Sequence, residues 1–413
     1  MANNNNKDKC NVPPLRFPEF TEEWQEHKLC NIASIVGRIG FRGYTTNDIV
    51  AKGKGAIALS PTNIENNRLT YDKDNTYISF YKYEESPEIM IKQGDVVFVK
   101  TGSTVGKVAY VDKLMCKTTL NPQVIVLKNI QCDNYLLSVL MSTSRFQNAI
   151  RKITVGGAVP TLSQAAMGDI AVTMPQVAEQ EKLSKFISLL DKRIATQNKI
   201  IEKYESLIKG LNDSLYAQYG DDVLTSFSSL GFSYSGLSGK SAQDFGSGKP
   251  FITYLNVYSN NIINEKDFQY VAIKEGEKQN VVEYGDVLFT LSSETPEEVG
   301  IGSVYLGNEN VYLNSFCFGI HIINTKIAFP PYLSYYVSST PFRKFIYPYA
   351  QGSTRFNLCK VDFEKASIKL PSLENQKRIY SILSHIESKT ETEKSLLDLY
   401  NSQKQYLLRQ MFI

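Results

Sequence analysis

Small polar and basic side chains gather at two similar places in each half of the sequence. One place follows an apolar run that begins Gly-Asp-Val, at 94–98 and 285–289, and the other is a glycine loop at 156–161 and 352–357. Ser, Thr, Asn, Lys and Arg can bond phosphate oxygens and base edges, and glycine lets a backbone approach a ligand closely. We therefore take these segments as candidate DNA contacts: Lys100, Thr101, Ser103, Thr104, Lys107 and Thr161 in the first half, and Ser292, Ser293, Ser353, Thr354, Arg355 and Asn357 in the second.

Two further segments combine aromatic rings with side chains that can read bases. An arginine can bond guanine with two N–H groups, and an asparagine can bond adenine in the same way. Residues of these types are also common in solvated turns, so that alternative stays open for each position. The candidates are Arg38, Arg42 and Tyr44 in the first half, and Tyr254, Asn256, Tyr258 and Asn260 in the second.

Three apparent catalytic signatures are incomplete. The segment 102–107 resembles a phosphate-binding loop, but it is one residue short and Val108 replaces the hydroxyl that would bind magnesium. The Phe-Pro-Pro-Tyr segment at 329–332 lacks the Asp or Asn acceptor of DNA amino-methyltransferases. Six cysteines without a C-x-x-C pair and three histidines suggest neither a zinc site nor a catalytic triad. The sequence predicts no catalytic centre, metal site or cofactor in this chain.

Composition and charge limit the class of protein. A chain of 413 residues with 42% hydrophobic side chains is long enough for two or three domains with cores of their own. It contains no apolar run of roughly 20 residues, and residues 1–10 lack the apolar stretch of a signal peptide, so we expect a cytoplasmic protein. A net charge of +3 is small for a protein that holds nucleic acid by charge alone.

The charge is distributed unevenly along the chain. Residues 1–175 carry 20 basic and 16 acidic side chains, whereas residues 218–371 carry 12 and 15. If the chain binds DNA, we expect the positive charge to be focused in a groove or supplied by a partner.

Comparison of the sequence with itself reveals two copies of one unit. Residues 175–215 align without a gap on residues 371–411 at an offset of 196, so that Gln180 meets Gln376. The Gly-Asp-Val runs and the glycine loops correspond as well, which predicts a globular domain followed by a long helix, twice. The predicted divisions are a first domain at 1–175, a first helix at 176–217, a second domain at 218–371 and a second helix at 372–413.

Both helical stretches show a heptad pattern, with core positions that alternate by four and three residues. A seam this regular over five heptads is typical of a coiled coil, although two amphipathic helices packed on separate domains remain an alternative. Gln197 and Glu393 fall in one central layer, where polar residues would fix the register. The core positions are Leu183, Ile187, Leu190, Ile194, Gln197, Ile201, Tyr204, Ile208, Leu211 and Leu215, and Ile379, Leu383, Ile386, Thr390, Glu393, Leu397, Tyr400, Lys404, Leu407 and Met411.

The two globular halves alternate short β-type runs with helical stretches. Strands are expected at 76–81, 95–100, 107–111 and 123–128, then at 286–291, 303–306 and 317–323. Single helices are expected at 133–153 and 331–346, and the Ser/Gly-rich stretch 225–240 is interpreted as a linker. The predicted fold class is α+β, with two similar mixed domains separated by two long repeat helices.

Several of these motifs resemble the specificity (S) subunit, HsdS, of type I restriction-modification systems. They are the segment 12–33, the paired Gly-Asp-Val runs, and the helix entries MPQVAEQEKLSKFISLLDKRI and LPSLENQKRIYSILSHIESK. Residues 234–260 look like the start of a target recognition domain of firmicute, staphylococcal-like members. The resemblance covers nearly the whole chain.

The resemblance implies a non-catalytic subunit of a methyltransferase and endonuclease complex. Each target recognition domain would read one half of a bipartite, asymmetric site in double-stranded DNA. The repeat helices, packed antiparallel with pseudo-two-fold symmetry, would set the spacer and dock two methyltransferase (M) subunits that methylate adenine at N6. The implied S-adenosylmethionine belongs to the M subunits, and ATP and Mg belong to the restriction (R) subunits. A coiled-coil adaptor, or a solitary DNA-binding or anti-restriction protein, is the alternative.

Overall fold

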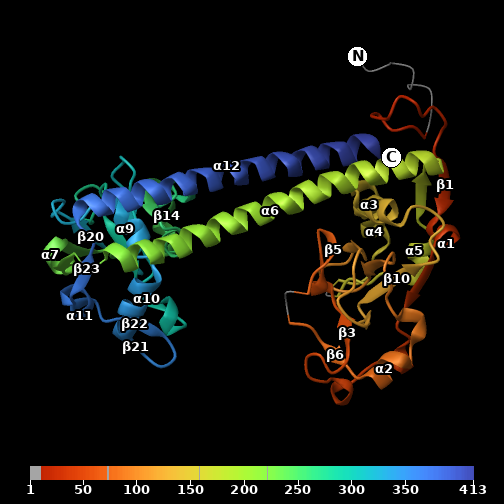
Figure 1. The fold of residues 1–413 in the computed structure, drawn as a ribbon, viewed down its shortest axis with the longest axis horizontal. Coiled ribbons are helices and arrows are strands. Elements are labelled where there is room, and N and C mark those ends of the chain that lie inside the picture. The colour runs from red at the N-terminus through yellow and green to blue at the C-terminus, as the bar shows by residue number, and fades with distance from the viewer. Residues whose placement is uncertain (1–10, 72–73, 158, 221) are drawn as a thin grey trace. The chain divides into compact units, whose positions relative to one another are not determined.

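The computed structural model describes residues 11–71, 74–157, 159–220 and 222–413, and its residues form two compact units (Figure 1). Unit 1 comprises Met1–Thr196 and Leu397–Ile413, and unit 2 comprises Gln197–Leu396. Each unit therefore takes one globular half of the sequence together with parts of both long helices. The four-part division predicted from the sequence stays a prediction, because the compact units cut across it.

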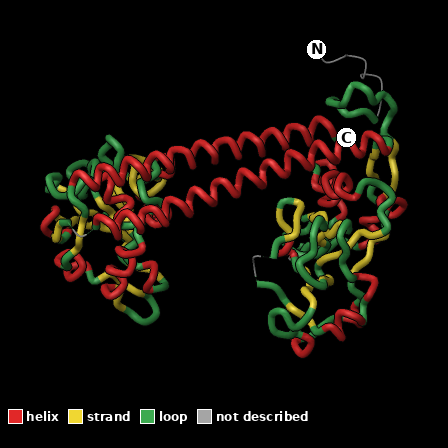
Figure 2. The backbone as a smooth tube through the Cα atoms, in the orientation of Figure 1, coloured by secondary structure: helices red, strands yellow, loops and turns green. Residues whose placement is uncertain are grey.

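Unit 1 contains a six-stranded sheet with the order β2-β10-β7-β8-β5-β4, a three-stranded sheet β6-β3-β9 and the pair β1-β11. The strands are short and joined by long loops (Figure 2). Their bounds are β1 (Gln25–Lys28), β2 (Ser34–Gly37), β3 (Ala56–Leu59), β4 (Ile64–Glu65), β5 (Asn67–Leu69), β6 (Tyr77–Ile78), β7 (Val96–Val99), β8 (Val108–Tyr110), β9 (Thr118–Leu120), β10 (Val124–Lys128) and β11 (Ala171–Met174). The short α-helices are α1 (Leu29–Ile32), α2 (Phe80–Glu84), α3 (Asn134–Ser142), α4 (Ser144–Ile153) and α5 (Gln164–Gly168).

Unit 2 is built around a four-stranded sheet with the order β13-β20-β16-β18, and it adds the sheets β15-β14-β19 and β17-β22-β21 and the pair β12-β23. The strands are β12 (Val223–Thr225), β13 (Gly231–Ser235), β14 (Phe245–Ile252), β15 (Gln269–Val271), β16 (Val287–Thr290), β17 (Ser292–Ser293), β18 (Gly302–Val304), β19 (Tyr312–Leu313), β20 (Cys317–Ile322), β21 (Ala350–Gln351), β22 (Phe356–Leu358) and β23 (Ile368–Leu370). The short α-helices are α7 (Phe227–Leu230), α8 (Tyr254–Ser259), α9 (Pro330–Tyr336), α10 (Thr340–Ile346) and α11 (Lys360–Lys365).

The apolar runs that follow Gly-Asp in the sequence are the central strands β7 and β16. Every residue of each strand is buried. Side chains alternate across a strand, so Phe98 packs in a core with α3, while its neighbours Val97 and Val99 pack in a separate core on the other face. A strand covered on both faces is apolar throughout rather than at every second position, which explains why these runs stand out in the sequence.

The two long helices are α6 (Val177–Tyr219) and α12 (Leu373–Met411). In unit 1, Leu183 and Ile187 of α6 share a core with Met411, and Lys404 Nζ lies 2.5 Å from Asp191 Oδ1. In unit 2, Leu215 shares a core with Ile379, and Gln197 bonds Glu393. In both units, later residues of one helix meet earlier residues of the other, so the helices pair antiparallel.

The core positions predicted for the two helices are buried or half-buried in the structure. Gln197 Nε2 donates to the backbone oxygen of Glu393 at 3.1 Å and to its carboxylate. Residues 197 and 393 occupy equivalent positions in the repeat. Two antiparallel copies of one helix bring equivalent residues together only at their centre of symmetry, so the predicted polar layer marks that centre.

Four local predictions were wrong. The helices expected at 133–153 and 331–346 are each two helices. Thr143 adopts extended backbone angles that end α3 and begin α4, whereas α9 ends at Tyr336 and Ser339, which is also extended, begins α10. The strand expected at 76–81 stops at Ile78. Ser79 caps the start of α2, because its hydroxyl accepts a hydrogen bond from Lys82 N–H. The stretch 225–240 is not a linker, because it supplies α7 to the core and β13 to the central sheet.

Candidate nucleic-acid recognition sites

Unit 2 brings three of its candidate segments together just past the end of β16. There Ser292 and Ser293 form β17, which pairs with Asn357 and Phe356 of β22, and β22 pairs in turn with β21. We call β17, β22 and β21 the loop sheet of unit 2. Gly352 lies at a φ of +146° in the turn between β21 and β22, where an added Cβ would meet Arg355 O at 2.1 Å. Only glycine permits this turn, which carries Ser353, Thr354 and Arg355 as exposed residues.

Arg355 is fixed against this loop sheet. Its Nε and Nη2 donate to Ser292 Oγ at 3.3 and 3.2 Å, and its Cζ lies 5.9 Å from the ring centroid of Phe316. Ser292 is 6% exposed, whereas the Phe316 ring is 56% exposed. The guanidinium is therefore held between a buried hydroxyl and an aromatic ring at the surface.

Helix α8 closes the site from another side. Tyr254 donates its phenol hydrogen to Ser292 O at 2.9 Å, and its ring stacks on that of Tyr258 with centroids 6.0 Å apart. Tyr258 Oη and Ser293 Oγ donate to the two Glu298 oxygens at 2.7 and 2.9 Å. These hydrogen bonds, led by that of Tyr258, lower the pKa of the Glu298 carboxyl. Glu298 thus ties α8 to the strand that carries Ser292.

Unit 1 has the same backbone arrangement at the end of β7. Thr161 pairs with both Thr101 and Val155 through isolated β-bridges, and Leu162 N donates to Lys100 O at 2.8 Å. Gly156 has a φ of +103°, and a Cβ there would meet Val159 O at 2.7 Å. The loop 155–161 with Thr101 is the loop sheet of unit 1. Ala158 within it lies outside the described residues.

The backbone hydrogen bonds establish which residues of the two sites are equivalent. Lys100 N donates to Gln123 O at 2.9 Å in unit 1, and Leu291 N donates to Phe316 O at 2.9 Å in unit 2. The Thr101–Thr161 pair corresponds to the Ser292–Asn357 pair. The equivalent positions are therefore Lys100 and Leu291, Thr101 and Ser292, Gln123 and Phe316, Val159 and Arg355, and Thr161 and Asn357. The scaffold is shared, but none of these pairs keeps its side chain.

Two predicted contact residues, Arg38 and Asn256, are buried and bonded within their own units. Arg38 is 7% exposed and donates to Leu120 O at 2.9 Å and Thr119 Oγ1 at 3.1 Å. Asn256 is 2% exposed and bonds both the backbone oxygen and the backbone N–H of Asn264. Both side chains are buried and already bonded within their own unit, which favours a structural role.

The remaining candidates differ in how open they are. Tyr44 Oη accepts from Asn121 Nδ2 at 3.0 Å, Arg42 Nη1 lies 3.4 Å from Glu88 Oε1, and Asn260 Nδ2 donates to Asn256 Oδ1 at 3.0 Å. Exposed or half-buried positions on the turn after β7 are Lys100, Ser103, Thr104 and Lys107. The assignment of these residues as DNA contacts stays a prediction.

Sequence reasoning missed Phe316 and Glu298. Phe316 follows Asn314, whose Oδ1 accepts from Phe316 N at 2.9 Å, as Asn121 Oδ1 accepts from Gln123 N at 2.9 Å in unit 1. An asparagine that closes a tight turn before the last central strand in both halves was a signal in the sequence. No such signal existed for Glu298, because its partner Tyr258 lies 40 residues away in the sequence.

The helix entries that repeat in the sequence attach each long helix to its unit. Gln180 Nε2 donates to Pro175 O at 2.8 Å, and its Oε1 accepts from Asp133 N at 2.9 Å. Gln376 bonds Pro371 O at 2.8 Å and Phe329 N at 2.7 Å in the same manner, and adds Ile327 O at 2.7 Å. The glutamine is the same in both copies because it satisfies the same backbone groups.

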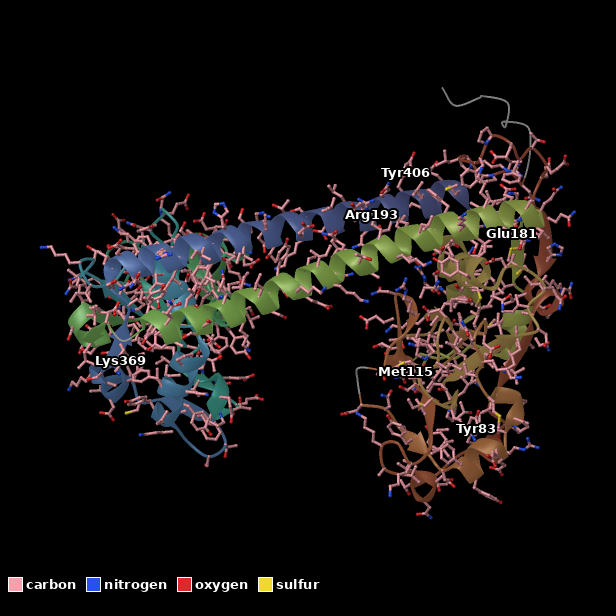
Figure 3. All side chains as sticks on the ribbon, viewed as in Figure 1. Tyr83, Met115, Glu181, Arg193, Lys369 and Tyr406 are labelled. Atoms are coloured by element: carbon pink, nitrogen blue, oxygen red, sulfur yellow. The ribbon has the colours of Figure 1, made fainter. Side chains whose placement is uncertain are left out.

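The surfaces of the long helices carry large apolar side chains as well. Leu183, Ile187 and Ile201 of the predicted seam are buried in α6, and Ile379 and Leu383 are buried in α12. Gln197, Thr390 and Met411 of the seam are buried as well, and the other predicted positions are half-buried, among them Leu190, Ile194, Ile386, Glu393 and Leu397. Outside the seam, the exposed apolar residues include Phe186, Leu189, Leu207, Ile382, Leu399 and Tyr406. Tyr406 is labelled on α12 in Figure 3.

Among the described residues, no group of three or more His, Cys, Asp or Glu side chains could hold a metal ion. No helix in the same part of the chain is both long and apolar enough to cross a membrane.

Comparison with known proteins agrees with this architecture. The family model described as the type I restriction modification DNA specificity domain matches residues 21–206 and again residues 238–399. Because the two matches cover most of the chain, the protein belongs to this family. The two copies also coincide with the two halves of the sequence repeat.

One curated relative and two solved structures resemble parts or all of this chain. The type I restriction enzyme MjaVIII specificity subunit of Methanocaldococcus jannaschii is 26% identical over 149 residues, which cover 36% of this chain and 34% of that relative. The type I restriction-modification system S subunit of M. genitalium has a TM-score of 0.54 at 14% identity, over 97% of this chain and 99% of that one. A chain from a structure on complex assembly and conformational transition of the type I R-M system also reaches 0.54, at 16% identity, over 96% of this chain and 98% of that one. These structures share the fold, and the predicted firmicute origin stays a prediction.

Proposed function

We propose that this chain is the DNA sequence-specificity subunit of a type I restriction-modification complex. Each globular domain reads one half of a bipartite, asymmetric site in double-stranded DNA. The observation that supports this most strongly is the pair of loop sheets, which have the same backbone hydrogen bonds but different side chains at equivalent positions. Such a pair suits two recognition sites that evolved on one scaffold to read two different sequences, because base edges are read by side chains.

The two long helices set the spacer between the half-sites and dock two M subunits. Support for docking comes from exposed apolar residues along the helices, such as Leu189, Leu399 and Tyr406, whose apolar surface a bound subunit would cover. The chain itself is non-catalytic. Adenine N6 is methylated by the M subunits with S-adenosylmethionine, and R subunits add cleavage with ATP and Mg.

The charge of the second globular half supports the proposal that the M subunits contribute to DNA binding. The second globular half carries 12 basic and 15 acidic side chains, so its own electrostatic attraction for a phosphate backbone is weak. M subunits that contribute phosphate contacts would supply the missing affinity. We therefore expect the isolated chain to bind DNA weakly and in a strongly salt-dependent manner. Tight sequence-specific binding by the isolated chain at about 0.2 M salt would contradict this.

The decisive experiment is methylation mapping. The chain is co-expressed with its M subunit in a host that lacks DNA methylation, and N6-methyladenine is located by long-read sequencing. A bipartite motif that disappears when this chain is omitted is the expected result. A stable complex without methylation would favour a solitary DNA-binding or anti-restriction protein, and failure to form any complex would favour a coiled-coil adaptor.

The role of the helices as a spacer has its own test. Removal of one heptad from each of α6 and α12 shortens the helix pair by about 10 Å, which is close to three base pairs of DNA. We expect the same two half-sites with a spacer shorter by about three base pairs. Removal from α6 alone is the control, because it shifts the paired seams out of register and should abolish the complex. An unchanged spacer in the double deletion would refute the spacer role.

A further inference from the structure

The loop sheet of unit 2 presents one positively charged group that is fixed in position. Arg355 is exposed at the turn after Gly352, and its guanidinium is bonded through Nε and Nη2 to the hydroxyl of Ser292. Ser292 is buried on β17, where Tyr254 bonds its backbone oxygen at 2.9 Å. A long side chain on a loop usually loses conformational freedom when it binds, and this hydroxyl removes part of that cost in advance.

The hydrogen bonds that hold Arg355 leave three N–H groups of its guanidinium free to bind a ligand. A guanidinium has five N–H groups in one plane, and the two bonds to Ser292 use one on Nε and one on Nη2. The other Nη2 hydrogen and the two on Nη1 form a fork at the far side of the group. The ring centroid of Phe316 lies 5.9 Å from Cζ, within the range of a cation–π contact. A planar fork matches the paired O6 and N7 acceptors of guanine in the major groove.

Charge distinguishes a base contact from a phosphate contact here. Domains that hold DNA by its phosphates usually carry a surplus of cations, whereas residues 218–371 carry three more acidic than basic side chains. The carboxylate of Glu298 is also fixed in the same site by Tyr258 and Ser293. A single preorganised guanidinium in an acidic domain is better suited to reading a base than to attracting the backbone.

From these observations we infer that Arg355 reads a guanine, through its major-groove edge, in the half-site recognised by the second domain. This inference rests on the proposed function. Ser292 acts as a positioning residue for that contact, and Phe316 supplies a cation–π contact to the same guanidinium. Unit 1 has Val159 at the equivalent position, so the first domain does not make this contact.

The test uses the full chain in complex with its M subunit and the same methylation mapping. Substitution Arg355→Ala should make one guanine of one half-site degenerate, with a loss of preference for guanine of roughly tenfold to a hundredfold. The other half-site and the spacer should be unchanged. Arg355→Lys keeps the charge but not the fork, so its preference for guanine should fall to an intermediate value.

Control substitutions separate reading from folding. Ser292→Ala should reduce the preference for the same guanine by less than Arg355→Ala does, and Ser292→Thr, which keeps the hydroxyl, should restore it. Val159→Ala is the matched control in unit 1 and should leave that guanine fully specified. If Arg355→Ala forms no complex, the lysine substitution decides, and full guanine preference with lysine would overturn the inference.

Other outcomes also have defined meanings. An unchanged motif in Arg355→Ala would overturn the inference. An unchanged motif with methylation lowered equally at all sites would also overturn it, because this result indicates a phosphate contact. The proposed function itself fails only if the unaltered chain directs no methylation motif, and the unaltered chain is measured in the same experiment.

Discussion

The two units place a carboxylate at the start of the same central strand but surround it with different hydrogen-bond partners. In unit 1, Asp95 accepts from Lys92 N at 2.8 Å and from Lys128 Nζ at 3.1 Å. In unit 2, Asp286 accepts from Glu283 N at 2.9 Å, from Tyr234 Oη at 2.6 Å and lies 2.7 Å from His321 Nδ1. The registers Phe98–Ile125 and Phe289–Phe318 make Lys128 and His321 equivalent.

This difference resembles that between the two loop sheets. The backbone hydrogen bond to the carboxylate is kept in both units, while the side chains that complete the site have changed. Backbone groups must be paired wherever they are buried, so they constrain the scaffold, but a side-chain partner can be exchanged for another of suitable charge. The molecule therefore shows which parts of a recognition domain are fixed by folding and which are open to change.

Loss of the carboxylate should affect unit 2 more than unit 1. Burial raises the pKa of Asp286 and of Tyr234, and removal of Asp286 would leave the buried Tyr234 hydroxyl and Glu283 N–H without their acceptor. We expect Asp286→Ala to cost about 3 kcal/mol of unfolding free energy, and Asp95→Ala about 1 to 2 kcal/mol, because Lys128 also bonds Met90 O. Urea unfolding, monitored by amide hydrogen exchange in each unit, measures the loss of unfolding free energy in both variants.

The chain provides an internal control for that measurement. Its one tryptophan, Trp24, is buried in unit 1 and packs against Phe412 with ring centroids 6.2 Å apart. Tryptophan fluorescence should therefore follow unit 1, and its transition should move in Asp95→Ala. Equal losses in the two variants would show that the extra partners of Asp286 add nothing. Asp286→Asn, which keeps an acceptor, should lose less than Asp286→Ala.

The repeated glutamine offers a second comparison, in which the two units should respond alike. Gln180→Ala and Gln376→Ala each leave buried backbone groups without partners, which should cost about 2 kcal/mol, with Gln376 somewhat higher because it makes one more bond. Thermal unfolding by circular dichroism measures the loss. A loss below about 0.5 kcal/mol in either variant would indicate that water replaces the glutamine.

The smallest expected effect concerns the outer sheet β15-β14-β19 of unit 2 and its response to acid. Lys240 bonds Glu277, and this hydrogen bond, together with those from Lys274 N and Gln279 Nε2, lowers the pKa of the Glu277 carboxyl from 4.5 to about 2. A lowered folded pKa means that the pair stabilises the fold above pH 4.5 and that this contribution is lost as the pH falls toward 2.

Comparison with Lys240→Met isolates that effect. The unfolding midpoint of the unaltered chain should exceed that of the variant at pH 6, and the difference should shrink between pH 4.5 and the lowest pH at which the chain folds. A difference that stays constant with pH would mean that Lys240 acts through its bond to Ala272 O instead.

Much of the fold could be predicted from local pattern. The helices α6 and α12 follow from a heptad seam, the central strands β7 and β16 from short apolar runs, and the duplication from a constant offset of 196. The heptad seams and the apolar runs each lie within one continuous stretch, and the duplication is visible when two such stretches are compared. The breaks at Thr143 and Ser339 were missed, although Ser and Thr commonly begin helices, because apolar residues continue on both sides of them.

The sequence by itself determined the elements, their repetition and the segments that contain the candidate sites. Only the tertiary structure decided which of the candidate side chains are available. Arg38 is bonded to Thr119 and Leu120, more than 80 residues away, and is buried, while Arg355 meets Ser292 and Phe316 and remains at the surface. The two arginines differ in burial and partners because different distant segments pack beside them. The residues adjacent to an arginine in the sequence do not determine which distant segments those are.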